Sequence, residues 1–345
     1  MSAGKKVLIV GNWHWDIYEE ALANGFRSNG WTVLVFVTDK YLSLSTMGMI
    51  QTRLRLGTTL GKLNKALVSS YRRSKPDIVF FYRSDLILAE TLKLMKKINE
   101  MARFVIYHND NPFIGFHNKL KYRHYLACIP YADLTLAYRP SNISDAQAYG
   151  ARNVALFPPN YLSYRHRPIP ASVSTDCDVV YIGHYEADGR AEILDYLIKN
   201  GVKIGIFGEN WGSVKNKYSW PDLVKVTRIW GDQYARLISS AKIALVFLSH
   251  KHRDVYTRRC FEITACGTLM MAPRTHELEG YFKDGKEAVY FDSKQDLLQK
   301  IRYYLVRDSE RIGIAQTGRK RCVHDGHDEI SRVRQLIKAL SALGY

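Results

Sequence analysis

The sequence lacks several features that would define its class at once. No apolar run approaches the roughly 20 residues that a membrane-spanning helix needs. No repeat of short period and no low-complexity tract is present, so neither a repeat architecture nor a disordered chain is expected. With 345 residues, of which 46% are hydrophobic and 24% charged, the chain is long enough for two globular domains.

Cysteine is also scarce. The five cysteines show no paired spacing, and most stand in apolar surroundings (Cys128, Cys177, Cys260, Cys266 and Cys322). This pattern predicts reduced, buried thiols rather than a disulfide framework. The N-terminal apolar run is only "VLIV", which is too short for a signal peptide. We therefore expect a cytoplasmic protein, which would lie on the inner face of a membrane if it works at one.

Acidic residues are under-represented in the first half. Residues 1–168 hold 23 basic and 11 acidic side chains, whereas residues 169–345 hold 27 and 22. Such an excess favours a polyanionic partner: nucleic acid, a phosphate-bearing substrate or an anionic membrane surface. The basic run 53–75 places Leu54, Leu56, Leu60, Leu63, Leu67 and Val68 on one stripe. It is either a core helix with a solvated basic face or a docking helix for anionic lipid or a phosphate-bearing acceptor.

Short apolar strands alternate with longer amphipathic segments along the chain. The first strands are "KVLIVGN", "WTVLVFVTD", "DIVFFYR" and "RFVIYHND", and the alternation restarts at "CDVVYIGH" after a proline-rich stretch, 157–176, that reads as a linker. Continuous apolar strands separated by helices predict parallel sheets covered on both faces. The sequence therefore predicts an α/β protein with two tandem doubly wound domains, 1–168 and 172–325, facing a central cleft. Residues 326–345 follow as a C-terminal helix.

A resemblance to a known family appears in the second half. "RCFEITACGTLMMAPRTHELEGYFKDGKEAVYF" contains the pattern Arg259-x-Phe261-Glu262-x-x-Ala265-x-Gly267 and follows the strand "KIALVFLS". It resembles the C-terminal domain of GT-B glycosyltransferases, most closely the CgeB-like group, over about residues 176–305. The resemblance implies a basic Rossmann-like N-terminal domain for the acceptor, a Rossmann-like C-terminal domain for a nucleotide sugar, and a last helix that packs back on the N-terminal domain.

The resemblance also implies roles for three residues near the helix that carries this pattern. Glu262 would bind the nucleotide ribose, because a carboxylate can accept from both hydroxyls of a vicinal diol. Arg259 would counter the diphosphate charge. Asp254 stands eight residues before Glu262, the spacing of a Glu-x7-Glu pair in retaining enzymes, with a side chain one methylene shorter. The alternatives are a surface ion pair of Glu262 with an adjacent arginine, and a solvated loop acid at Asp254.

Two further loops match positions where relatives contact the nucleotide. In "GHYEADGR", the turn at Gly183 is followed by His184 and Arg190, which would hold phosphates, with Arg190 the better candidate because it is always charged. In "RIWGDQYARL", the backbone at Ile229 or the ring of Trp230 would meet the nucleobase. The alternatives are an ordinary glycine turn and an ordinary strand end.

In the first half, candidate catalytic residues follow predicted strands. His108 in "YHND" resembles a histidine that contacts the donor sugar in retaining enzymes. Asp110 would instead be a general base in an inverting enzyme. Asp16 in "GNWHWD" is a second candidate base, or the cap of the next helix. Retention or inversion stays open.

The function expected from these residues is transfer of a hexose-type sugar from a nucleotide-diphosphate sugar to a glycan, lipid-linked or phosphate-bearing acceptor, in cell-surface glycan or glycoconjugate synthesis. No cofactor beyond the donor and no metal is expected, because basic side chains and helix dipoles can stabilise the leaving diphosphate. The metal-like spacing of "CVHDGHD" (322–328) has no second cluster to complete a site. The alternatives are a nucleotide-sugar epimerase or hydrolase of the same fold, and a non-catalytic nucleic-acid-binding protein.

Overall fold

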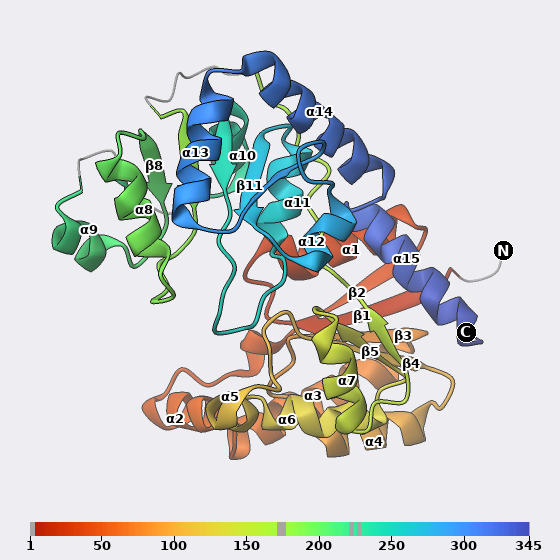
Figure 1. The fold of residues 1–345 in the computed structure, drawn as a ribbon. Coiled ribbons are helices and arrows are strands. Elements are labelled where there is room, and N and C mark those ends of the chain that lie inside the picture. The colour runs from red at the N-terminus through yellow and green to blue at the C-terminus, as the bar shows by residue number, and fades with distance from the viewer. Residues whose placement is uncertain (1–3, 171–176, 221–223, 226–228, 345) are drawn as a thin grey trace. The chain divides into compact units, whose positions relative to one another are not determined.

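The computed structural model describes residues 4–170, 177–220, 224–225 and 229–344. They form two compact units, one of residues 1–159 with 329–345 and one of residues 160–328. In the described part of the chain, each unit contains one six-stranded sheet whose neighbouring strands all run parallel, with helices packed around it (Figure 1). The predicted doubly wound α/β architecture is confirmed. None of the described helices has the length and apolarity to cross a bilayer.

The sheet of the first unit has the order β2-β1-β3-β4-β5-β6. Its strands are β1 (Lys6–Gly11), β2 (Thr32–Val37), β3 (Ile78–Tyr82), β4 (Arg103–Tyr107), β5 (Leu134–Ala137) and β6 (Val154–Leu156). The helices are the π-helix η1 (Asp16–Glu20), α1 (Ala21–Ser28), the 3-10 helix η2 (Thr38–Tyr41), α2 (Thr46–Leu54), α3 (Thr58–Ser74), α4 (Ala89–Ile98), α5 (Gly115–Lys121), α6 (Arg123–Cys128), the 3-10 helix η3 (Ile129–Tyr131), α7 (Ser141–Ala148) and α15 (Glu329–Ala342).

The sheet of the second unit has the order β12-β11-β10-β7-β8-β9. Its strands are β7 (Val179–Ile182), β8 (Ile204–Phe207), β9 (Val224–Lys225), β10 (Ile243–Leu245), β11 (Leu269–Pro273) and β12 (Val289–Phe291). The helices are α8 (Arg190–Lys199), α9 (Gly212–Tyr218), α10 (Gly231–Ser240), α11 (Arg258–Ala265), α12 (His276–Tyr281), α13 (Lys294–Leu305) and α14 (Asp308–His324).

The central strands are apolar on both faces, which explains why both faces of these strands are buried under helices. All residues of β3 and β7 are buried, and β1 is buried from Val7 onward. In the first unit Val7 pairs with both Val33 and Ile78. Strand order reverses beside β1 in one sheet and beside β7 in the other, because the next strand in sequence lies on one side and a later strand on the other. Ligands of such sheets bind outside the carboxyl ends of the strands at this reversal.

The boundary between the two units, after residue 159, lies within the proline-rich stretch 157–176 that the sequence indicated as a linker. Residues 160–170 belong to the second unit because they carry buried side chains: Tyr161, Leu162 and His166 are almost inaccessible. The Tyr161 N–H donates to the His327 carbonyl at 3.1 Å. Residues 171–176, the end of the predicted linker, lie outside the described residues. At the other end, the chain returns to the first unit from Glu329 onward.

Helix α15 packs on α1 within the first unit. The Asn29 side chain donates to the Ile330 carbonyl at 3.1 Å. The approach is close because Gly25 has no side chain: a Cβ there would lie 2.4 Å from Val333 Cγ2. The last helix is therefore an integral part of the first unit.

The basic run 53–75 divides between two helices. In α3, Leu60, Leu63, Leu67 and Val68 are buried. For this part of the run the structure therefore agrees with a core helix that has a basic outer face. Leu54 and Leu56, which precede α3, are more than half exposed. All five cysteines are buried and free, as the sequence predicted.

Candidate functional site

The site in the second unit is built where strand order reverses. Gly183 follows β7, and the loop after β10 includes Ser249, whose hydroxyl donates to Glu186 Oε2 at 2.6 Å. The two loops at the reversal are therefore tied together. A third loop lies against them: the Tyr185 N–H donates to the Glu209 carbonyl at 2.9 Å. At Gly208 a Cβ would lie 2.2 Å from the Gly183 carbonyl oxygen, so this close approach requires glycine.

Arg190 lies under this loop with its donors occupied. It is buried at the start of α8, and its Nε and Nη2 donate to the two carboxylate oxygens of Asp188 at 2.7 and 2.5 Å. Its Nη1 donates to Tyr181 Oη at 2.9 Å and to the His184 carbonyl at 3.0 Å. A two-pronged ion pair of this kind is strong and fixed in direction. Arg190, for which the resemblance implies a phosphate-binding role, is thus engaged by Asp188, Tyr181 and the loop backbone.

His184 and Glu186 form an ion pair on the outer side of the same loop. His184 Nε2 lies 3.0 Å from Glu186 Oε1, and the histidine side chain is about half exposed. The hydrogen bond from His184 is the main cause that lowers the pKa of Glu186 to about 2, and the Ser249 hydroxyl and Arg190 act in the same direction. Glu186 is thus a carboxylate at every ordinary pH, and His184 faces a negative group rather than an open phosphate position.

Arg259 lies beside the same turn and, unlike Arg190, has no ion-pair partner among the described residues. It lies in the first turn of α11, partly accessible, and within the described part of the chain its guanidinium makes neither a hydrogen bond nor an ion pair. A Cβ added at Gly183 would lie 3.4 Å from Arg259 Cζ, so the guanidinium lies directly below the turn that ends β7. Burial alone would lower the pKa of Arg259, but Tyr181, Tyr234 and Glu262 nearby raise it overall, so the group stays charged.

Glu262 is buried one turn further along α11. Its Oε2 accepts a 2.6 Å hydrogen bond from the Tyr234 hydroxyl of α10. Oε1 lies 4.0 Å from His166 Nε2 and accepts no hydrogen bond within the described residues. Burial, together with the adjacent Glu262 carboxylate, raises the pKa of Tyr234 well above its ordinary value. The ion pair with a neighbouring arginine that the sequence left open does not form; a tyrosine hydroxyl takes that place.

The remaining predicted residues of the second unit surround this helix. Asp254 lies in the loop before α11, partly buried, and its N–H donates to the Ser249 carbonyl at 3.0 Å. Trp230 is the N-cap residue of α10 and is about half exposed, and Ile229 before it is partly buried. Helix α10 also carries Tyr234, so the loop of Trp230 and the Glu262 carboxylate are joined through one helix.

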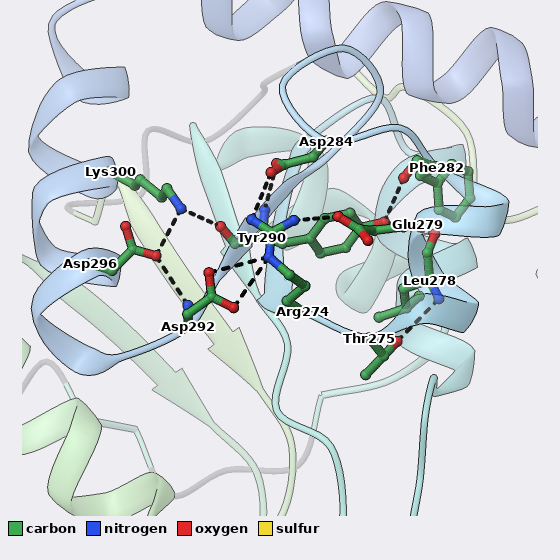
Figure 2. Close-up of polar contacts among 10 residues, drawn as sticks. All are labelled: Arg274, Thr275, Leu278, Glu279, Phe282, Asp284, Tyr290, Asp292, Asp296 and Lys300. Atoms are coloured by element: carbon green, nitrogen blue, oxygen red, sulfur yellow. Dashed lines mark hydrogen bonds and ion pairs between the residues drawn. The ribbon is translucent and has the colours of Figure 1, made fainter.

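Helix α11 is fixed from behind by aromatic side chains. Phe261, which is fully buried, packs edge-on against Tyr281 of α12 at 5.3 Å between ring centroids, and against His327 at 4.8 Å. Helix α12 is itself held by Arg274, which follows β11 and contacts three carboxylates at its side (Figure 2). Asp284 lies 2.8 Å and Asp292 3.2 Å from the guanidinium, and Glu279 is the third partner (Figure 2). This arginine is structural.

In the first unit, His108 and Asp110 lie together after β4. His108 is buried; its Nδ1 accepts the Asp110 N–H at 3.1 Å, and its Nε2 therefore carries the proton and donates to Asp85 at 3.0 Å. Asp110 Oδ2 accepts from the Tyr122 hydroxyl at 2.8 Å and lies 3.6 Å from Arg83. With both ring nitrogens engaged, His108 has no lone pair with which to take a proton, whereas Asp110 keeps a carboxylate.

Asp16 begins η1 after β1 and is exposed. Strands β1, β3 and β4 are neighbours in the sheet, so Asp16, Asp85 and Asp110 all follow strands at one edge of it. Beneath the same turn, Glu19 is completely buried: its Oε1 accepts the Asn12 N–H at 3.0 Å, and burial raises its pKa.

The stretch with metal-like spacing does not gather into a site. Cys322 is buried against the Phe261 carbonyl, His327 packs among aromatic rings, and the His324 side chain is almost fully exposed. Within the described ranges, no group of three or more His, Cys, Asp or Glu side chains is arranged to hold a metal ion.

Sequence reasoning missed the partners that decide these roles: Tyr234, His166, Asp188 and Ser249. The partial burial of Tyr234 was foreseeable, because Tyr234, Leu237 and Ile238 share one face of a helical pattern in "DQYARLISS". Its partner was not, since Glu262 lies 28 residues away in sequence.

The comparisons with known proteins agree with this architecture. A family model described as "Glycosyl transferase-like" matches residues 190–338. None of the curated proteins matches the chain by sequence.

Three solved structures illustrate the likeness of fold. Anabaena HepE in complex with UDP and glucose is 12% identical with a TM-score of 0.70, and the match covers 98% of this chain and 100% of HepE. Sucrose-phosphate synthase from Thermosynechococcus elongatus is 13% identical with a TM-score of 0.72, with 98% and 100% covered. A glycosyltransferase from Rickettsia africae is 12% identical with a TM-score of 0.68, with 97% of both chains covered. At such identities the likeness establishes the fold.

The chain therefore has the GT-B fold, and the match over residues 190–338 supports a glycosyltransferase of this type. No match distinguishes the narrower CgeB-like group, which stays a prediction.

Proposed function

We propose that the protein is a glycosyltransferase whose second unit binds a nucleotide-diphosphate sugar at the carboxyl ends of β7 and β10. The observation that carries this proposal is Arg259, a partly accessible guanidinium beside Gly183 that forms no ion pair or hydrogen bond with a described residue. An arginine in such a position is costly unless an anion arrives to pair with it. Its planar donors fit the oxygens of a diphosphate, and the N-terminus of α11 adds its dipole in the same place.

Glu262 is the proposed ribose ligand. It follows Arg259 by three residues, so both side chains lie on one side of α11. Oε1 is the oxygen available to a hydroxyl, whereas Oε2 is already bonded to Tyr234. A ribose diol would thus meet one free oxygen and compete with Tyr234 for the other. In this proposal Trp230 lies against the nucleobase, and Arg190, Gly183 and His184 shape the loop around the phosphates; Asp254 contributes near the sugar.

The sugar and the acceptor are the finer part of the proposal. HepE was solved with UDP-glucose and the Escherichia coli trehalose-6-phosphate protein with UDP-2-fluoro glucose; these names support a hexose donor. The acceptor would be a glycan, lipid-linked or phosphate-bearing molecule held by the basic first unit, in cell-surface glycan or glycoconjugate synthesis. Asp110 would then be the general base in an inverting reaction, since its carboxylate is ionisable whereas His108 has no free nitrogen.

The test is binding of nucleotides by the whole chain. Thermal shift with UDP, GDP and TDP and their glucose conjugates should show a rise for one base, because a ligand at 100 times its Kd stabilises by about 2.7 kcal/mol. Arg259→Ala should weaken that ligand roughly 10- to 100-fold, the loss of a charge-assisted hydrogen bond. Arg259→Lys should fall between, because it keeps the charge and loses the planar donors. Arg258→Ala, whose side chain instead donates to the Asn160 carbonyl, is the matched control.

Ribose recognition has its own readout. The wild-type protein should bind the ribonucleotide more tightly than its 2′-deoxy form, and Glu262→Ala should remove that difference. If no nucleotide raises the melting temperature, or if Arg259→Ala leaves the shift unchanged, the site assignment is wrong. Release of free nucleotide or an altered sugar at an undiminished rate without any acceptor would favour the epimerase or hydrolase alternative.

A further inference from the structure

Helix α2 turns its apolar side chains outward. Met47, Ile50 and Leu54 recur at positions that share one face of a helix, and each is about half exposed or more. The side chain that ties α2 to the next helix is polar instead: Gln51 Oε1 accepts the Thr59 N–H at 3.0 Å at the start of α3. The Thr52 hydroxyl donates to the Gly48 carbonyl within α2 itself. This is the reverse of an ordinary surface helix, which buries its apolar face.

Helix α5 has the same inversion. Phe116 and Leu120 stand one turn apart, with exposed fractions of 84% and 51%. The residue between them that faces inward is polar: Asn118 is buried and donates to the Asn111 carbonyl at 3.0 Å. An exposed phenylalanine at a helix surface loses the stabilisation that burial of its ring would give. Two helices that both expose apolar side chains and bury polar ones indicate a surface that is covered by an apolar partner.

The two helices belong to one surface. Arg123, which begins α6 directly after α5, donates to the Arg55 carbonyl at 2.8 Å and also to that of Leu54. His124 Nε2 lies 2.7 Å from the same Arg55 carbonyl. In Figure 1, α2, α5 and α6 are drawn at the same end of the first unit, and the Arg123 hydrogen bonds join α6 to the residues that end α2. We call this surface the apolar–basic face; its apolar members are Leu44, Met47, Ile50, Leu54, Phe116 and Leu120.

The charge around this face has one sign. Residues 40–76 contain eight Lys or Arg and no Asp or Glu, and residues 111–132 contain three Lys or Arg and no Asp or Glu. Arg53 on α2 and Lys119 on α5 are both exposed beside the apolar side chains. Large aliphatic and aromatic side chains rimmed by basic ones match a surface that is apolar inside and negative outside.

We propose that the apolar–basic face docks on an anionic lipid bilayer, with Phe116, Leu54 and their neighbours in the headgroup boundary and Arg53 and Lys119 on the lipid phosphates. A second copy of the chain is a poorer occupant, because a two-fold contact would bring the basic rims together. Nucleic acid would pair with the basic residues but leave the aliphatic ones against water. This inference concerns only the first unit and stands independently of the nucleotide site.

The test is co-sedimentation of the full-length protein with vesicles. Binding is expected to vesicles of equal parts phosphatidylcholine and phosphatidylglycerol, to be weak with phosphatidylcholine alone, and to fall as salt rises. The variant Leu54→Ser/Phe116→Ser should lower the partition coefficient at least about tenfold, since two large apolar side chains no longer enter the boundary. Arg53→Glu/Lys119→Glu should lower it at least about 25-fold, because each basic residue at the surface is worth about a fivefold change.

Control variants distinguish docking through this face from non-specific binding to vesicles. Lys203→Glu/Val306→Ser changes an exposed cation and an exposed apolar residue of the second unit, and should bind vesicles as the wild type does. All four positions of the test variants are exposed, so melting temperatures should be unchanged. Equal binding by the test variants and the wild type would overturn the proposal, as would absence of binding to anionic vesicles. Loss of a dimer, or of oligonucleotide binding, in the same variants without vesicle binding would assign the face to those partners instead.

Discussion

The hydrogen bond between Tyr234 and Glu262 should contribute measurably to stability. Tyr234→Phe removes only the hydroxyl, which lies 2.6 Å from Oε2 of the buried Glu262 in a partly buried setting. Hydrogen bonds to charged groups contribute about 1.5–3 kcal/mol, and the loss also leaves a buried carboxylate oxygen without a donor. We therefore expect a loss of about 2 kcal/mol in the free energy of unfolding of the second unit.

The assay is urea unfolding of the full chain, followed by calorimetry to resolve the unit that changes. For a unit of residues 160–328, a loss of about 2 kcal/mol corresponds to a melting temperature lower by roughly 4–8 °C. Tyr290→Phe is the control: its buried hydroxyl lies 2.8 Å from two backbone carbonyl oxygens, which share its one proton, so its loss should cost about 1 kcal/mol, as a neutral bond does.

A double-mutant cycle isolates the pair. If the two groups stabilise each other, Tyr234→Phe and Glu262→Gln together should cost less than the sum of the single changes. A loss below about 0.5 kcal/mol for Tyr234→Phe, or strict additivity in the cycle, would refute the view that Tyr234 anchors this carboxylate. The same variant should also alter discrimination between ribonucleotide and 2′-deoxynucleotide, because Oε2 is released.

Three further outcomes follow from the packing. Glu186→Gln should lower the free energy of unfolding at neutral pH by about 2–4 kcal/mol, because the pKa of Glu186 falls from 4.5 to about 2 on folding. The stabilisation from the Glu186 carboxylate is complete above pH 4.5 and is lost as the pH drops through 2. The stabilities of wild type and variant should therefore converge in acid. Arg274→Ala should destabilise the second unit by about 1–3 kcal/mol in urea unfolding, with Arg274→Lys partly restoring it, since three carboxylates lose their shared cation. Gly25→Ala should cost about 1–3 kcal/mol in the first unit by the same assay, because its Cβ would overlap Val333.

Much of the fold could be predicted from the sequence because its central strands carry a strong local signal. Runs such as "KVLIV" and "DIVFFY" are apolar on both faces, and with helical segments between them they are typical of a parallel sheet covered on both sides. The division between units was harder. Prolines mark irregular backbone but do not indicate what that backbone packs against, and Tyr161, Leu162 and His166 became part of the second unit through tertiary contacts.

The sequence motifs do not distinguish the environments of Arg190 and Arg259. Arg190 and Arg259 both follow strands and both looked like phosphate ligands. Asp188, two residues before Arg190, curls back through the turn at Gly189, which has a φ of +92°, and neutralises Arg190. The two-residue spacing of Asp188 and Arg190 does not by itself predict a two-pronged ion pair, because the pair forms only when the residue between them adopts a left-handed backbone conformation. Arg259 has no such partner, because the nearest acid on its own helix, Glu262, is bonded to a tyrosine from another helix.

The relative positions of Arg259 and Glu262 in the proposed site depend on the residues that pack against the buried face of α11. Arg259 and Glu262 can keep a fixed separation only if the helix between them does not rotate, and its eight residues are too few to be rigid alone. Phe261, which lies between them in sequence, is held by Tyr281 and His327, and Tyr281 belongs to the helix that follows Arg274 and its carboxylates. The ion cluster of Figure 2 therefore positions the nucleotide ligands indirectly, so Arg274→Ala should weaken nucleotide binding as well as stability, although Arg274 touches neither Arg259 nor Glu262.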